Sequence, residues 1–140
     1  MSGKIEKQLS AWLPVILWAA LIFHLSSGTV PLASTIYWQD FAVKKTGHVL
    51  LFGALSILIY RALRMNKIDR KKAAVFAVIL STFYGATDEF HQMFTQGREA
   101  RVRDVFFDGG GATLVVLATY YLPAKFSKKI YTLAEKFNLN

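Results

Sequence analysis

The chain has 140 residues, of which 54% are hydrophobic and 14% aromatic, and its 17 lysines and arginines outnumber its 9 acids for a net charge of +8. This length excludes a two-domain enzyme, and the apolar content excludes intrinsic disorder. The absence of cysteine excludes disulfides, thiolate catalysis and cysteine-ligated zinc. The basic excess leaves two partners open, nucleic acid and a membrane surface.

Four apolar segments follow one another along the chain, and we expect an all-α bundle of four transmembrane helices. The first lies between Lys7 and Asp40, in a stretch without Asp, Glu, Lys or Arg, and it is long enough to cross a bilayer, which takes about 20 helical residues. The charge-free parts of the other three are shorter, so their helices must draw ionisable residues into the membrane edge. The expected spans are residues 9–27, 44–63, 73–92 and 104–122, followed by a basic tail over 123–140, all in one domain over residues 1–140.

The first segment has an alternative interpretation as a secretory signal peptide, with Lys4 and Lys7 as its basic region. No small-x-small cleavage site is well placed after this segment. We therefore favour a membrane span.

The basic residues predict the orientation, because cytoplasmic connections of membrane proteins carry the excess of lysine and arginine. One side would hold the N-terminus, the second connection and the C-terminal tail, and the other side the first and third connections. The richer set is Lys4, Lys7, Arg61, Arg64, Lys67, Arg70, Lys71, Lys72, Lys125, Lys128, Lys129 and Lys136, against Lys44, Lys45, Arg98, Arg101 and Arg103. Both termini are therefore predicted to be cytoplasmic.

The outer ends of three helices carry polar residues at helical spacing. Lys45 and His48 lie three residues apart at the start of the second span, as Asp104 and Asp108 lie four apart at the start of the fourth. The end of the third span carries two neighbouring stripes, Glu89 with Gln92 and Asp88 with His91. Charged groups within a span are costly unless they are paired or face a wet cavity. We therefore expect these side chains to form one cluster.

This cluster allows several interpretations. Salt bridges among Lys45, Glu89, Arg101 and Asp104 would only fasten the bundle, whereas a shallow outer pocket with Lys45, His48, Arg98 and Arg101 would bind an anionic group such as a lipid phosphate. Catalysis is a weaker alternative, with Glu89 or Asp104 as general base beside His48, because no nucleophile elbow, P-loop or H-E-x-x-H motif is present. A metal has enough nitrogen and oxygen ligands in His48, Asp88, Glu89, His91 and Asp104, but we assign none. Nucleic-acid binding is not expected, since the basic residues flank the spans.

Dense motifs occupy the second half of the chain: Thr87-Asp88-Glu89-Phe90-His91-Gln92-Met93-Phe94, then Gly97-Arg98, Arg103-Asp104-Val105, Asp108 and Gly111. The first half adds Ser26-Ser27 and Lys45-Thr46-Gly47-His48. Together they resemble the VanZ-like family of small bacterial membrane proteins. The chain departs from the family pattern at Leu51 and Phe52, where many members have an acid and a tyrosine, and at Val115 in place of a second glycine.

The resemblance implies a multi-pass protein of the bacterial cytoplasmic membrane and a link to low-level teicoplanin resistance, but it supplies no reaction. Our first hypothesis is that an outward site binds an anionic envelope lipid or a polyprenyl-phosphate-linked cell-wall precursor. The alternatives are a membrane enzyme acting on a lipid phosphate and a structural module that holds a protein partner. The candidate catalytic residues are Glu89, His48 and Asp104, and the candidate ligand-binding residues are Lys45, Gln92, Arg98, Arg101, Asp108, Asp88 and His91, with no cofactor assigned.

Overall fold

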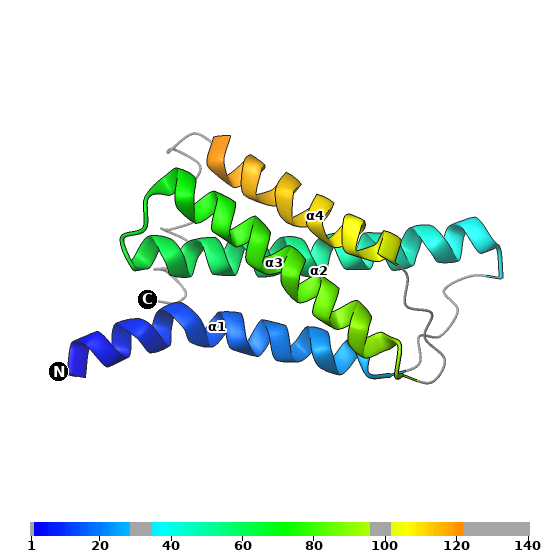
Figure 1. Ribbon diagram of the computed structural model, residues 1–140, viewed down its shortest axis with the longest axis horizontal. Coiled ribbons are helices and arrows are strands. Elements are labelled where there is room, and N and C mark those ends of the chain that lie inside the picture. The colour runs from blue at the N-terminus through cyan, green and yellow to red at the C-terminus, as the bar shows by residue number, and fades with distance from the viewer. Residues whose placement is uncertain (1, 29–34, 96–101, 122–140) are drawn as a thin grey trace, which may run out of the picture.

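The computed structural model describes residues 2–28, 35–95 and 102–121, and within these ranges the protein consists of four α-helices and no strand. The helices are α1 (Ser2–Ser26), α2 (Tyr37–Met65), α3 (Arg70–Gln92) and α4 (Val102–Tyr121). Successive helices run in opposite directions, so that the end of α1, the start of α2, the end of α3 and the start of α4 all lie toward the right of Figure 1. We call this the polar end of the bundle.

The expectation of an all-α fold is confirmed, and each predicted span lies on its own helix. The helices extend beyond the predicted spans at most ends, most clearly at the starts of α1 and α2, which begin at Ser2 and Tyr37. As a result, Pro14 lies further inside α1 than a helix beginning at residue 9 would place it.

Helices α2 and α3 are joined by a tight turn with its own side-chain chemistry. Lys67 has a positive φ of 62°, which reverses the chain after α2. The side chain of Asp69 then accepts hydrogen bonds from the backbone N–H groups of Lys71, at 3.0 Å, and Lys72, at 3.1 Å. Asp69 is therefore the N-cap of α3 and satisfies two donors that have no partner within the helix.

The bundle packs around a small apolar core formed by Ile22, Phe52, Leu55, Ile59, Ala77 and Val116. Two aromatic side chains attach α1 to this core: the Trp18 indole N–H donates to the Leu51 carbonyl at 2.9 Å, and the Tyr84 hydroxyl donates to the Ala19 carbonyl at 2.7 Å. Helices α2 and α4 approach closely, because a Cβ on Gly111 would lie only 2.7 Å from the Val49 carbonyl oxygen.

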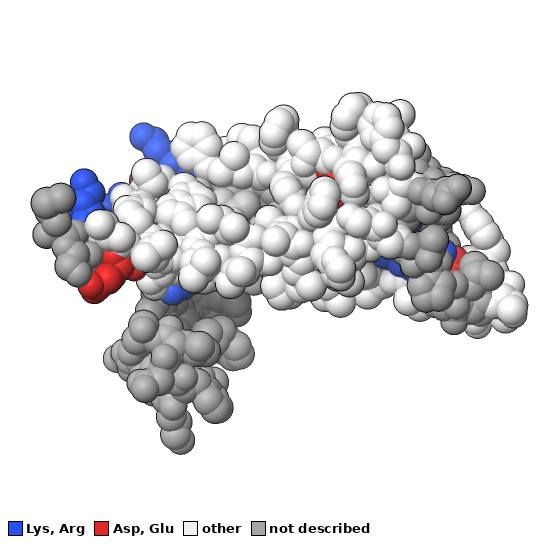
Figure 2. Space-filling view, turned by 90° about the horizontal axis from the view of Figure 1, so that it is seen from below, with Lys and Arg blue, Asp and Glu red and all other residues white. Residues whose placement is uncertain are grey.

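The outer surface of the helices is apolar over much of its length. Figure 2 shows a broad uncharged middle, with most of the visible charge toward the two ends of this face. Two helices are long and apolar enough to cross a membrane, Gly3–Ser26 and Tyr37–Met65. In the most apolar 18-residue segment of each helix, only 17% and 33% of the residues are buried within the bundle. A core helix of a soluble protein would bury far more of its apolar surface. The two helices are therefore candidate membrane spans.

Within the described residues, helices α3 and α4 do not qualify as membrane spans by length and composition alone. The reason lies in their turns at the polar end, where Asp88, Glu89, Asp104 and Asp108 interrupt the apolar sequence. That all four helices cross the membrane stays a prediction.

Candidate functional site

The polar end of the bundle gathers most of the buried charged side chains of the described residues. At this end α1 contributes its last turn, α2 its first turns, α3 its last turns and α4 its first turns (Figure 1). Burial of this kind is unusual for carboxylates unless they are paired or bound to a cation. The buried polar residues here are Ser26, Asp88, Glu89, Gln92, Asp104 and Asp108.

His48 and Asp108 form the innermost contact of this group. The His48 Nδ1 atom lies 2.9 Å from Oδ1 of Asp108, and the aspartate is completely buried. When Asp108 is ionised and the imidazole is neutral, Nδ1 donates this hydrogen bond, because a carboxylate only accepts, and Nε2 keeps its lone pair. Gly85 makes room for the aspartate, because a Cβ at that position would lie 2.8 Å from Oδ2 of Asp108.

Lys45 and Asp104 form a second contact one turn nearer the helix ends. The Lys45 ammonium pairs with Oδ2 of Asp104, and both side chains are largely buried. The rings of Phe41 and Phe107 lie 5.6 and 5.7 Å from the ammonium and shield it. The ion pair thus fixes the start of α4 against the start of α2.

Glu89 is the member that α3 contributes to this group. One carboxylate oxygen of Glu89, one of Asp104 and one ring nitrogen of His48 all lie within 4.8 Å of one another. We call these three residues, one from each of α2, α3 and α4, the triad. The helical stripes predicted that Lys45, His48, Glu89, Asp104 and Asp108 share one site, and the structure brings them together.

Asp88 and Gln92 belong to a neighbouring group that faces α1. The Ser26 hydroxyl and the Gln92 amide each donate to Oδ2 of Asp88 at 2.8 Å. The His91 ring packs against the ring of Phe23 of α1, with ring centroids 4.4 Å apart and the planes tilted by 30°. Arg98 and Arg101, which the sequence also placed at the site, lie outside the described residues.

Sequence reasoning missed two features of the site. Ser26 was noted only as part of a motif, although its position at the end of a span, level with the end of α3, is compatible with a hydrogen bond to Asp88. The aromatic pair around Lys45 was also missed, because Phe41 and Phe107 lie on different helices and no local spacing relates them.

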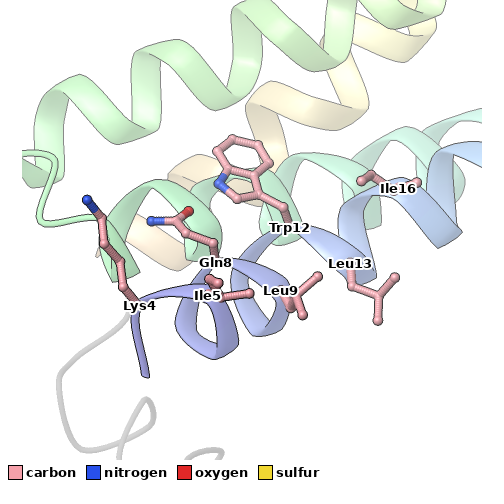
Figure 3. A pocket seen from close by; sticks show the side chains of 7 residues that line it. All are labelled: Lys4, Ile5, Gln8, Leu9, Trp12, Leu13 and Ile16. Atoms are coloured by element: carbon pink, nitrogen blue, oxygen red, sulfur yellow. The ribbon is translucent and has the colours of Figure 1, made fainter. Parts of the chain in front are cut away.

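Two open hollows on the surface of the described residues are apolar, and no residue of the triad lines either of them. One of about 440 Å³ follows the N-terminal half of α1, at the opposite end of the bundle (Figure 3). A second of about 450 Å³ lies between α3 and α4 on the outer surface. The first is lined by Lys4, Ile5, Gln8, Leu9, Trp12, Leu13 and Ile16, and the second by Thr82, Val105, Phe106, Gly109, Gly110, Thr113 and Leu114. Their apolar linings suit acyl chains better than a polar reaction.

Comparison with known protein families gives a match over most of the chain. The model of the VanZ/LLP1 family matches residues 9–123, which include all four helices apart from the first turns of α1. No curated protein and no solved structure matches the chain. Since the matched region covers most of the sequence and contains every residue of the triad, this chain belongs to the VanZ/LLP1 family.

Proposed function

We propose that the chain is a four-span protein of the bacterial cytoplasmic membrane, with both termini in the cytoplasm and the polar end facing outward. The turn between α2 and α3 and the start of α1 lie together at the opposite end of the bundle (Figure 1). That end carries Lys4, Lys7, Arg64, Lys67, Arg70, Lys71 and Lys72. This concentration of basic residues supports a cytoplasmic location for it.

We further propose that the polar end binds the phosphate-bearing head group of an anionic envelope lipid or a lipid-linked cell-wall precursor. The observation that carries this proposal is the placement of Lys45 at the head of a bundle with apolar sides. Its side chain is 13% exposed, and its ammonium lies among aromatic rings and is held by one carboxylate. A lipid in the outer leaflet would bring its phosphate to this level, while its chains lie along α3 and α4.

A pair of matched ligands and a pair of matched variants test this function. The purified chain in detergent is heated with polyprenyl phosphate or with the polyprenol that lacks the phosphate, and unfolding is followed by circular dichroism. We expect stabilisation by the phosphate alone, lost in Lys45→Gln and kept in Lys44→Gln, because Lys44 pairs with Asp40 outside the cluster. Phosphatidylglycerol in a separate series distinguishes a general anionic lipid from the polyprenyl carrier.

The lipid proposal is contradicted if polyprenol and polyprenyl phosphate shift the melting temperature equally. Such a result would favour the third interpretation, in which the charged ends only hold helices for a protein partner.

A membrane enzyme acting on the same lipid phosphate is the second candidate. The observation that favours it is the His48–Asp108 hydrogen bond, which orients the imidazole as a general base beside the Glu89 carboxylate. Glu89→Gln discriminates between the two functions. A variant that binds polyprenyl phosphate normally but releases no phosphate, where the native chain does, establishes catalysis; equal release by both excludes Glu89 as the acid or base.

Reduced susceptibility to teicoplanin is the phenotype we propose for binding of a cell-wall precursor. Expression of the native chain in a susceptible host should raise the inhibitory concentration of teicoplanin, and Lys45→Gln should abolish the increase. If the native chain is present in the membrane at its normal amount and the inhibitory concentration does not change, this protein does not confer teicoplanin resistance.

A further inference from the structure

The triad has the composition of a metal site. An imidazole nitrogen and two carboxylate oxygens, all within 4.8 Å of one another, come from three different helices. Three ligands that each lie about 2.0–2.2 Å from one tetrahedral or trigonal ion are about 3.3–3.8 Å apart. The three side chains would therefore close in on the ion when it binds, by no more than about an ångström.

The environment of His48 is that of a metal-binding histidine. Ligating histidines usually donate their second ring N–H to a carboxylate, which fixes the tautomer and the ring orientation. Here Nδ1 lies 2.9 Å from Oδ1 of Asp108. In the tautomer in which Nδ1 donates to the ionised carboxylate, the lone pair of Nε2 is left for a ligand. Asp108 is completely buried, so this orienting contact is shielded from water.

Asp104 provides an independent sign that a cation belongs here. The residue is only 5% exposed, and its Oδ1 atom accepts no hydrogen bond within the described parts of the chain. Oδ2 is held by Lys45, while Arg103 Nε lies 4.0 Å from Oδ1, beyond hydrogen-bonding distance. A buried carboxylate oxygen without a partner costs free energy, and a cation in the triad would remove that cost.

We propose that His48, Glu89 and Asp104 bind a divalent transition-metal ion of the Zn²⁺ or Mn²⁺ class, with Asp108 as the residue that positions His48. A mixed donor set of one nitrogen and two oxygens suits these ions, whereas Ca²⁺ and Mg²⁺ prefer oxygen ligands alone. A role of this ion in lipid recognition depends on the proposed function, in which the ion would supply positive charge for the phosphate. The existence of the metal site depends only on the geometry of the triad.

The test is a metal titration of the full chain in detergent, purified without a histidine tag and stripped with a chelator. Isothermal titration calorimetry with Zn²⁺ and with Mn²⁺ should show one saturable site per chain for at least one of them. Glu89→Gln should weaken the affinity by roughly tenfold or more, and Asp108→Asn by about 10–100-fold, as for other residues that orient a metal ligand. Asp40→Asn is the matched control, because it removes a carboxylate from α2 that pairs with Lys44 outside the triad, and its affinity should equal that of the native chain.

Two results would overturn the proposal: no saturable binding of either ion, or equal affinities for the native chain and a folded Glu89→Gln. If the variants do not fold, X-ray absorption on the zinc-loaded native chain decides, and a first shell without an imidazole nitrogen excludes His48. Tighter binding of Mg²⁺ or Ca²⁺ would overturn the assignment to a transition metal. Because the titration contains no lipid, its outcome is independent of whether polyprenyl phosphate binds.

Discussion

At the scale of single residues, the neighbouring serines at the end of α1 have different roles. Ser26 is buried and donates to the Asp88 carboxylate on α3, whereas Ser27 is exposed and donates to the Phe23 carbonyl of its own helix. The first bond links two helices through a buried charge. The second replaces a contact with water at a helix end.

We expect Ser26→Ala to lower the free energy of unfolding by about 1–3 kcal/mol, because it removes a donor from a buried carboxylate that then depends on Gln92. Ser27→Ala is the control and should change it by less than about 0.5 kcal/mol. Chemical unfolding in detergent, followed by circular dichroism, measures both. Equal effects of the two substitutions would show that the Ser26–Asp88 bond does not stabilise the bundle.

The sequence could identify the residues of the polar end but not their partners. Helical spacing placed Lys45 with His48 and Asp104 with Asp108, because residues three or four apart share a face. Which carboxylate meets which cation depends on how each helix is rotated, and the rotation is decided by packing at sites such as Gly85 and Gly111. Asp88 illustrates the limit: its stripe lies next to that of Glu89, yet it bonds to α1.

At the scale of helices, the crossing of α2 and α4 depends on Gly111. A Cβ there would lie 2.7 Å from the carbonyl oxygen and 2.8 Å from the Cα of Val49, and these are backbone atoms that cannot move without moving α2. The adjacent Gly110 has nothing within 4 Å of its Cβ position. The two glycines therefore differ in packing while sharing the same helix.

Gly111→Ala should destabilise the protein by about 1–3 kcal/mol through overpacking. Gly110→Ala should leave stability unchanged or raise it by up to about 1 kcal/mol, since alanine favours the helix. Thermal unfolding of the two variants side by side measures the difference. If Gly111→Ala unfolds no earlier than Gly110→Ala, the two helices are not in the close contact described.

The start of α3 provides a pH-dependent element outside the membrane-spanning segments. The backbone N–H of Lys72, and then that of Lys71, donate to Asp69 and lower the pKa of its carboxyl below the ordinary 3.8. A lowered pKa in the folded state means that the contribution of Asp69 is complete above the unfolded pKa and is lost as the pH falls through the folded pKa.

Asp69→Ala should therefore be less stable than the native chain at neutral pH, and the difference should shrink as the pH falls below the ordinary carboxyl pKa of 3.8. Asp69→Asn keeps an acceptor for the cap without the charge, so its stability relative to Asp69→Ala should not depend on pH over this range. Melting temperatures across the pH series give the comparison. A difference between the native chain and Asp69→Ala that stays constant with pH would exclude the ionised cap.

At the scale of the whole molecule, four apolar segments predicted four helices, because the hydrophobic pattern reports directly on what must be kept from water. The helix ends were less well predicted, since polar residues such as Glu6 in α1 and Asp40 in α2 continue the helices beyond their apolar parts. The proposed orientation depends on how the charged residues are distributed between the two ends of the bundle.

Single cysteines in this cysteine-free chain test that orientation. Thr35→Cys and Phe94→Cys place a thiol at exposed positions of the polar end, and Lys71→Cys places one at an exposed position of the opposite end. In intact cells an impermeant maleimide should label the first two, and Lys71→Cys only after the membrane is opened. Labelling of Lys71→Cys in intact cells would show that the protein has the opposite orientation in the membrane. The triad would then face the cytoplasm, where no outer-leaflet lipid could reach Lys45.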